Sequence, residues 1–186
     1  MTAEILSIGT ELLLGEIVNS NAAYLAEQCA GLGISVFRQT TVGDNLARIV
    51  SAFERAFENA DLVIASGGLG PTADDLSREG ASAFFKKPMK LHEPSLKKIQ
   101  AFFNKIGKPM PKGNEKQAYY PEGSEILPNP KGSAPGIYFE EGGKILILLP
   151  GPPGEMKAMW EQEAKPRLLS KTHETLFSKT LRVAGL

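Results

Sequence analysis

The segment of this chain best suited to chemistry is a short apolar run that breaks into glycines and then into two adjacent carboxylates. It spans residues 61–75 and reads Asp-Leu-Val-Ile-Ala-Ser-Gly-Gly-Leu-Gly-Pro-Thr-Ala-Asp-Asp. Residues 62–65 are typical of a buried strand, and glycines after a strand let backbone amides approach an anion closely. These glycines are Gly67, Gly68 and Gly70. Because Asp74 and Asp75 follow at a predicted helix start, the segment is a candidate site for a phosphate and a divalent metal.

Two side chains of this segment also have a purely structural interpretation. Thr72 and Asp75 have the spacing of a capping box, in which both side chains bind free amides at a helix N-terminus. Capping does not explain Asp74, since a second carboxylate beside the first is usually either solvated or neutralised by a cation. The glycine turn lacks the Lys-Ser/Thr of a P-loop and does not match Gly-x-Gly-x-x-Gly, so neither common nucleotide fingerprint is present.

The composition limits the classes of function. With 186 residues, 42% of them hydrophobic and 23% charged, the chain is typical of a soluble globular protein with one substantial core. Its 21 basic and 21 acidic residues balance, so no broad surface for nucleic acid or for an anionic membrane is predicted. The longest apolar run, residues 145–149, is too short to cross a bilayer, and the N-terminus has no basic leader. We therefore expect a cytoplasmic protein.

Side chains that bind soft metals are scarce. The chain has two histidines, His92 and His173, and one cysteine, Cys29. A zinc site with nitrogen and sulfur ligands is therefore not predicted, whereas the plentiful carboxylates favour a hard ion. Cys29 lies at helical spacing between Leu25 and Leu32, which predicts a small core residue rather than a reactive thiol.

Strand-like and helix-like patterns alternate along the chain. Strands are predicted at residues 4–8, 34–42 and 62–65. Helices are predicted to begin near residue 20 and after Asp44, which is placed as an N-cap, and to span residues 74–85 and 94–106. A hairpin is predicted to join residues 138–139 to 144–149. Strands that alternate with helices of this length favour a doubly wound, mostly parallel sheet, so the predicted fold class is α/β.

One domain is predicted over residues 1–170. Within it, residues 107–136 contain six prolines and five glycines, which predicts a loop-rich insertion. Residues 171–186 alternate weakly, like a strand, and are expected to begin a linker to a further C-terminal domain.

Four unusual loops are expected at one end of the sheet, because ligands of open parallel sheets bind beyond the carboxyl ends of the strands. They are residues 9–15, 67–75, 129–136 and 149–155. If they converge, backbone amides and Lys131 can hold a diphosphate, while carboxylates offer metal ligands or a base. These carboxylates are Glu11, Asp44, Asp74 and Asp75.

Each loop also has a structural alternative. Asp44 is well placed to cap the following helix, and Glu11 and Glu155 can be solvated surface groups. Lys131 has the residue type of an exposed side chain, and the prolines at 150–153 can simply force a sharp exit from the sheet.

The motifs of these loops together resemble the N-terminal domain of the competence/damage-inducible protein CinA family over essentially the whole chain. They are Gly9-Thr-Glu-Leu-Leu-Leu-Gly15, Ser66-Gly-Gly-Leu-Gly-Pro-Thr-Ala-Asp-Asp75, Gly132-Ser-Ala-Pro-Gly136 and Leu149-Pro-Gly-Pro-Pro-Gly-Glu-Met156. That domain is similar to the molybdopterin-binding fold of MogA, MoaB and gephyrin, so the resemblance implies a three-layer α/β/α sandwich. The Gly-Gly-Thr-Gly loop of those proteins resembles residues 67–70 here, with Leu69 in place of threonine.

The resemblance implies a divalent-metal-dependent pyrophosphatase that hydrolyses ADP-ribose to AMP and ribose 5-phosphate, with Mg, Mn or Co as the metal and no organic cofactor. The catalytic residues it implies are Glu11, Asp44, Asp74 and Asp75, of which Asp74 and Asp75 bind the metal. The phosphate- or nucleotide-binding residues it implies are Thr10, Ser66, Gly67, Gly68, Gly70, Thr72, Lys131, Gly132, Ser133 and Gly151.

A second class of function stays open, namely a binding module for molybdopterin or another phosphorylated ligand without turnover. Asp74 beside Asp75 favours hydrolysis, and Leu69 in place of threonine disfavours a pterin ligand. Relatives of this fold associate, so a homo-oligomer is expected, with a small nucleotide diphosphate as ligand and neither nucleic acid nor membrane as a partner.

Overall fold

The computed structural model of the chain describes residues 1–172, and its centre is a six-stranded sheet with the order β2-β1-β3-β8-β7-β6. The strands are β1 (Thr2–Ile8), β2 (Ser35–Val42), β3 (Leu62–Ser66), β6 (Glu125–Leu127), β7 (Gly136–Glu141) and β8 (Lys144–Leu149). β2, β1, β3 and β8 run parallel, whereas β7 is antiparallel to both of its neighbours. The predicted α/β class, the mostly parallel sheet and the hairpin are confirmed.

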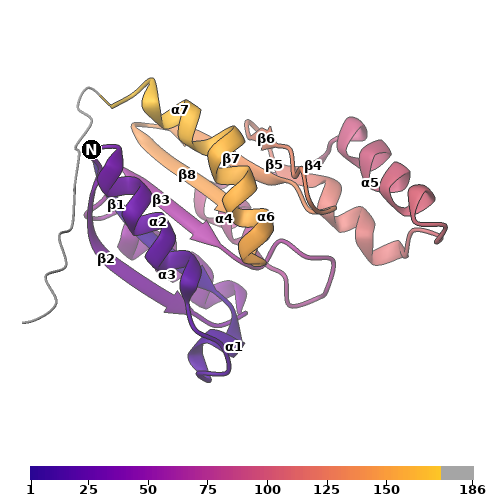
Figure 1. Ribbon diagram of the computed structural model, residues 1–186, viewed down its shortest axis with the longest axis horizontal. Coiled ribbons are helices and arrows are strands. Elements are labelled where there is room, and N and C mark those ends of the chain that lie inside the picture. The colour runs from indigo at the N-terminus through magenta and orange to yellow at the C-terminus, as the bar shows by residue number, and fades with distance from the viewer. Residues whose placement is uncertain (173–186) are drawn as a thin grey trace, which may run out of the picture.

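Helices cover both faces of the sheet. The helices of the main body are α1 (Thr10–Leu13), α2 (Ser20–Gly31), α3 (Leu46–Ala56), α4 (Ser77–Phe85), α6 (Pro153–Met159) and α7 (Lys165–Leu169), with a π-helical turn, η2 (Trp160–Ala164), between the last two. α2 and α6 to α7 pack on one face, with Ile5 and Ile64, and α3 and α4 pack on the other, with Leu6 and Val63 (Figure 1). The three-layer sandwich follows from the alternation of these strand residues.

Cys29, which was predicted to be a core residue, is buried in the cluster that also contains Trp160. Cys29, on α2, and Trp160 are each 0% exposed. Met156 and Met159 pack in the same cluster, so their helical spacing reflects packing.

Two predicted helix starts are wrong. Asn45, not Asp44, caps α3, because the Asn45 side chain accepts a hydrogen bond from the Arg48 amide and Asp44 is bound by Thr10 instead. α4 begins at Ser77 rather than at Asp74, because residues 72–75 form a separate turn that the Asp75 carboxylate closes.

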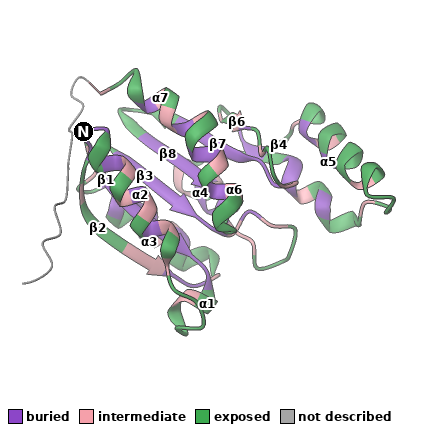
Figure 2. Ribbon diagram, in the orientation of Figure 1, coloured by how far each residue is buried: buried purple, intermediate pink, exposed green. Residues whose placement is uncertain are grey.

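A small lobe extends from the β6 side of the main sheet. It consists of β4 (Met89–Leu91), α5 (Glu93–Lys105), a 3-10 helix, η1 (Lys112–Ala118), and β5 (Tyr119–Pro121), which pairs with β4. α5 projects from the body (Figure 1), and it is largely exposed (Figure 2), with Ser95 and Ile99 as its buried residues. The loop-rich segment 107–136 contributes η1 and β5 to this lobe and β6 to the main sheet.

Most of the predicted strand-like tail, residues 173–186, lies outside the described residues. Among residues 1–172, no helix has both the length and the apolar character needed to cross a membrane.

Candidate functional site

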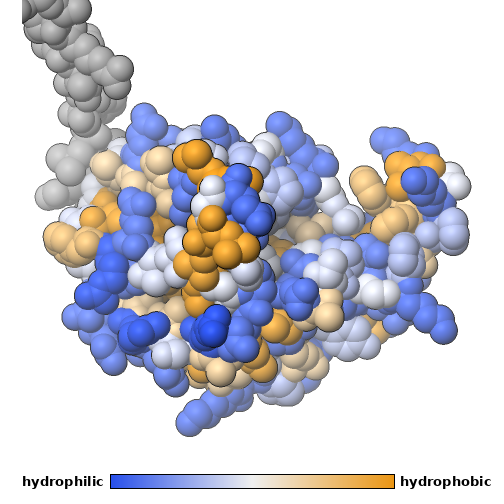
Figure 3. Space-filling model, turned by 90° about the horizontal axis from the view of Figure 1, so that it is seen from below, coloured by the Kyte–Doolittle hydropathy of each residue, from blue (hydrophilic) through white to orange (hydrophobic). Residues whose placement is uncertain are grey.

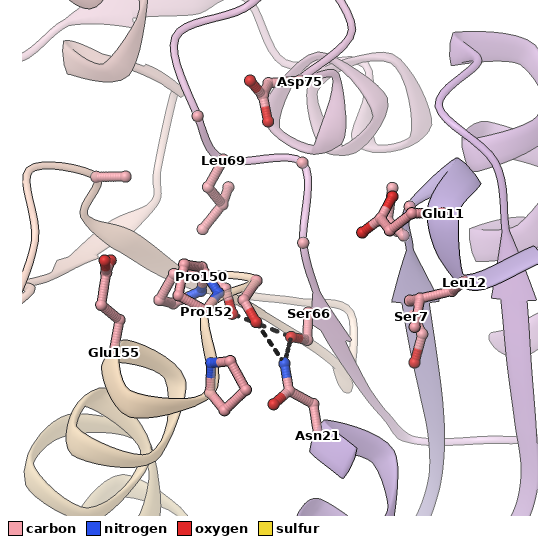
Figure 4. A pocket seen from close by; sticks show the side chains of 18 of the residues that line it. Ser7, Glu11, Leu12, Asn21, Ser66, Leu69, Asp75, Pro150, Pro152 and Glu155 are labelled. Atoms are coloured by element: carbon pink, nitrogen blue, oxygen red, sulfur yellow. Dashed lines mark hydrogen bonds between the residues drawn. The ribbon is translucent and has the colours of Figure 1, made fainter. Parts of the chain in front are cut away.

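A cavity of about 560 Å³ lies at the carboxyl ends of β1, β3 and β8, and all four predicted loops contribute to its wall (Figure 4). The predicted site residues that line it are Glu11, Asp44, Ser66, Gly67, Gly68, Gly70, Thr72, Asp74, Asp75, Ser133 and Gly151. The fold therefore brings together segments that are up to about 140 residues apart, as expected for the carboxyl edge of a parallel sheet.

Three predicted residues lie outside this wall. Thr10 reaches the cavity only through Asp44, which it binds. Lys131 and Gly132 line a separate groove beside α5. Their backbone amides both donate to the Asn129 side chain, at 2.9 Å each, so these amides are not free for a phosphate.

The glycine loop comprises residues 67–70. The carbonyl groups of its first three residues point toward α4. The Gly67 carbonyl accepts from the Ser77 hydroxyl at 2.7 Å, the Gly68 carbonyl accepts from the Ser77 amide at 3.1 Å, and the Leu69 carbonyl accepts from Arg78 Nη2 at 2.8 Å. In a planar trans peptide the N–H points opposite to the preceding C=O. The amides of residues 68, 69 and 70 thus point away from α4, and all three residues line the cavity.

These three amides have no backbone acceptor within residues 1–172. Consecutive free amides that converge on one side of a turn form a nest, a recurrent binding element for phosphate and other anions. The Gly67–Gly70 segment, with its free amides at 68, 69 and 70, is called the amide nest below.

Glycine is needed in the nest for steric reasons. Gly67 and Gly68 have φ of +108° and +64°, which side-chain-bearing residues rarely adopt. A Cβ on Gly67 would overlap the Ile8 carbonyl oxygen, and a Cβ on Gly68 would overlap the Ser77 hydroxyl. The tight packing of β1 and α4 against the loop fixes the nest in place.

Two carboxylates on the cavity wall are held in the same way. Asp75 Oδ2 accepts from the Thr72 amide at 2.9 Å and from the Thr72 hydroxyl at 2.6 Å. Asp44 Oδ2 accepts from the Thr10 amide at 2.7 Å and from the Thr10 hydroxyl at 2.8 Å. One oxygen of each carboxylate is thus fixed, which restrains the orientation of the other.

The capping-box interpretation is therefore only half correct. Asp75 does bind the Thr72 amide, as the reciprocal half of a capping box does. The Thr72 hydroxyl, however, donates to Asp75 instead of accepting from an amide, and no helix begins there.

The carboxylates do not form a closed metal cage. Among residues 1–172, no three His, Cys, Asp or Glu side chains lie close enough to hold an ion by themselves. Asp74 and Asp75 nevertheless share the cavity with the nest. Magnesium-like ions are commonly held by one or two carboxylates and completed by water and by phosphate oxygens of the substrate. The donor set fits an ion bound in this shared way.

Asn21 is a cavity residue that sequence reasoning missed. Its Nδ2 donates to Ser66 Oγ at 2.9 Å and to the Gly151 carbonyl at 2.7 Å, while Ser66 donates to the Pro150 carbonyl (Figure 4). Asn21 thereby ties α2 to the end of β3 and to the proline loop. The Asn-Ser-Asn run at residues 19–21, at the start of a predicted helix, was the signal that could have identified it.

Residues of η1 also bind the loops that form the cavity wall. Lys116 Nζ donates to the Thr72 carbonyl at 3.0 Å and to the Asp75 carbonyl, and it forms an ion pair with Glu79 at 3.2 Å. Gln117 contacts both the Leu69 carbonyl and the Ser133 hydroxyl. No local sequence pattern pointed to these residues, because η1 is far from the glycine loop in the sequence. The two segments meet only in the folded chain.

Leu12, Ile17 and Val18 form an apolar part of the cavity wall. Val18 is 89% exposed and Ile17 is 53% exposed, so two neighbouring aliphatic side chains present apolar surface here. Figure 3 shows hydrophobic side chains gathered at the end of the molecule where α1 lies. A cavity with an apolar wall and a few oriented polar groups is typical of a site for a small organic ligand.

Comparisons with known proteins find relatives over nearly the whole chain. The model of the "Probable molybdopterin binding domain" family matches residues 4–170. A CinA-like protein of Dictyoglomus thermophilum is 55% identical over 186 residues, which are all of this chain and 45% of that protein. The chain thus spans about half the length of the curated relatives it matches.

Solved structures show the same fold. The protein CinA from Thermoplasma acidophilum is 37% identical and superposes with a TM-score of 0.82, over 89% of this chain and 96% of that one. A molybdopterin biosynthesis protein from Mycobacterium abscessus is 16% identical, with a TM-score of 0.61 over 91% and 92%. The second likeness shows the fold alone. The chain therefore belongs to the molybdopterin-binding domain family and is a CinA-like member of it, with a MogA/MoaB-type fold.

Proposed function

We propose that the cavity hydrolyses ADP-ribose to AMP and ribose 5-phosphate with a divalent metal, Mg, Mn or Co. The observation that carries the proposal is the placement of the amide nest and of the Thr-oriented carboxylates, Asp44 and Asp75, on the wall of one cavity. An anion site beside oriented carboxylates suits a reaction in which phosphate charge must be neutralised and a water must be activated.

The chemistry is the cleavage of one phosphoanhydride bond. The oxygen of a water molecule bonds to one phosphorus, the bridging oxygen leaves with the other phosphate, and one proton of the water is released. The nest amides neutralise charge on the non-bridging oxygens. Asp44 or Glu11 accepts the proton of the attacking water, since both line the cavity. A bound metal, held by Asp74 and Asp75, would supply further charge neutralisation.

The apolar wall accounts for the organic part of the ligand. Leu12, Ile17 and Val18 can cover the adenine, because all three are apolar and line the cavity. The cavity volume of about 560 Å³ is in the range of small-molecule sites.

The test is product analysis after incubation with ADP-ribose and Mg, Mn or Co. The native chain is expected to form AMP and ribose 5-phosphate in equal amounts, and Asp75→Asn is expected to form neither above background. Asp61→Asn is the matched control, because Asp61 accepts from the Thr2 amide and hydroxyl in the same way and does not line the cavity. Equal turnover by Asp75→Asn and the native chain would refute the assignment.

The family model supports a second candidate, the binding of molybdopterin or another phosphorylated ligand without turnover. Thermal stabilisation by such a ligand, with no product under any metal, would favour it. A ligand at about 100 times its Kd adds roughly 2.7 kcal/mol to the free energy of unfolding, which a melting experiment detects.

A further inference from the structure

Arg78 is a buried cation without a direct ion pair among residues 1–172; Glu79 and Asp75 act on its charge only at longer range, and Glu79 pairs with Lys116. The residue is 1% exposed. Its guanidinium donates to the carbonyls of Leu69 at 2.8 Å and of Pro135 at 3.3 Å, and it lies over the Tyr120 ring at 5.9 Å. Its Nε has no hydrogen-bond partner among residues 1–172.

Such a group is costly to bury. A buried charge is normally paired, and carbonyl dipoles satisfy donors without cancelling the charge. Burial lowers the pKa of the Arg78 guanidinium, but arginine starts so high that it stays protonated at neutral pH. The folded chain therefore keeps a positive charge behind the glycine loop.

The amide nest lies directly between this charge and the cavity. The Leu69 peptide accepts from Arg78 on its inner side, and the Gly70 amide of the same peptide unit points outward. Arg78 also donates to the Pro135 carbonyl, so it links the glycine loop to the loop at 129–136. Its charge can thus act on an anion in the cavity through a single peptide layer.

We infer that Arg78 is a positioning residue whose charge complements the phosphates of the ligand and makes the site select a diphosphate over a monophosphate. The phosphates of the ligand would add negative charge beyond the long-range contribution of Glu79 and Asp75. Arg78 does not touch the ligand. It orients the Leu69 peptide and adds a fixed positive charge in a poorly solvated place, where electrostatic interactions are strong. The inference rests on the proposed function only in that the ligand carries phosphates.

The test measures the affinities for inorganic pyrophosphate and for inorganic phosphate by calorimetry. Arg78→Met removes the charge and both hydrogen bonds, Arg78→Gln removes the charge and keeps a donor, and Arg78→Lys keeps the charge. Arg38→Met is the matched control. Arg38 is a largely exposed arginine on β2 that pairs with Glu4 and does not line the cavity, so its removal changes the net charge equally.

The charge variants should lose more pyrophosphate affinity than phosphate affinity. Pyrophosphate is expected to bind about tenfold more weakly to Arg78→Met and Arg78→Gln, and phosphate about threefold more weakly, because the interaction scales with ligand charge. Arg78→Lys should stay within about threefold of the native chain for both anions, and Arg38→Met should be unchanged, since exposed charges are screened.

A purely structural role predicts a different pattern. Equal losses for both anions, or native affinities in Arg78→Gln, would overturn the inference. If Arg78→Met does not fold, the Gln and Lys variants decide in the same way. A native chain that binds pyrophosphate but does not hydrolyse ADP-ribose would end the hydrolase proposal alone, whereas a native chain that does not bind pyrophosphate would end the role of Arg78.

Discussion

Thr72 donates two hydrogen bonds to one oxygen of Asp75, from its backbone amide at 2.9 Å and from its hydroxyl at 2.6 Å. The pair closes the turn between the amide nest and α4, so the carboxylate is held at the rim of the cavity. Hydrogen bonds to a carboxylate are stronger than neutral ones, and a double contact restrains rotation of the side chain. The remaining oxygen, Oδ1, is thereby oriented rather than free to turn.

The hydroxyl contact of Thr72 should matter for turnover more than for stability. Thr72→Val keeps the side-chain shape and the amide contact but removes the hydroxyl. We expect a loss of about 1 kcal/mol in the free energy of unfolding and about a tenfold loss in kcat for ADP-ribose, since Asp75 becomes less well oriented. Urea denaturation and steady-state kinetics measure the two effects.

Thr2→Val is the matched control for this experiment. It removes the equivalent hydroxyl contact to Asp61, which does not line the cavity, so stability should fall similarly while kcat stays native. If both variants lose the same turnover, the orientation of Asp75 is not what Thr72 contributes.

Asn21 should be important for the proline loop. Its Nδ2 joins Ser66 to the Gly151 carbonyl, so Asn21→Ala leaves partly buried polar groups without this donor. Because an unpaired buried polar group is costly, we expect a loss of about 1–3 kcal/mol in the free energy of unfolding, measured in urea. Asn104→Ala, on the exposed part of α5, should cost less than about 0.5 kcal/mol. Equal losses in the two variants would contradict the role assigned to Asn21.

The fold could be predicted because its signals are local. The continuous apolar run at residues 145–149 and the helical spacing of Ile49 and Phe53 each reflect burial against a neighbouring layer. The choice of caps could not be predicted in the same way. Asp44 and Asn45 are both good capping residues, and Asp44 was excluded from the cap by Thr10, which is 34 residues away.

The residues of the site divide in the same way. Some could be predicted from the neighbouring sequence, and others depend on contacts with distant parts of the chain. Glycines after a strand predicted the position of the nest, since the chain itself must turn there. The contributions of Lys116 and Gln117 depend on how the lobe packs on the glycine loop, which no short pattern records. Lys131 was expected at the cavity from its loop alone, but the Asn129 side chain folds that loop so that Lys131 lies beside α5.

Cys29 should be unreactive in the folded chain. Burial raises the pKa of its thiol to about 12, and the side chain is 0% exposed on α2. The neutral thiol is favoured by the fold, so its contribution to stability is complete below the unfolded pKa of 9.0 and is lost as the pH rises through the folded pKa of about 12. A thiol reagent at pH 8.5 should label Cys29 only in denaturant. Fast labelling of the native chain would contradict the buried packing.

Gly67 should be the least replaceable residue of the amide nest. Gly67→Ala places a methyl group against the Ile8 carbonyl at a φ of +108°, so the loop must move and the amides at 68 to 70 lose their alignment. We expect a loss of at least about 2 kcal/mol in the free energy of unfolding, from strain together with overlap.

Gly142→Ala is the matched control. Gly142 also has a positive φ, +58°, but nothing lies within 4 Å of its Cβ position, so strain alone should cost about 1 kcal/mol. Denaturant unfolding and pyrophosphate calorimetry of both variants check the prediction. Gly67→Ala should also lose pyrophosphate binding, whereas Gly142→Ala should keep it. A Gly67→Ala variant that binds pyrophosphate like the native chain would show that the anion does not bind at these amides.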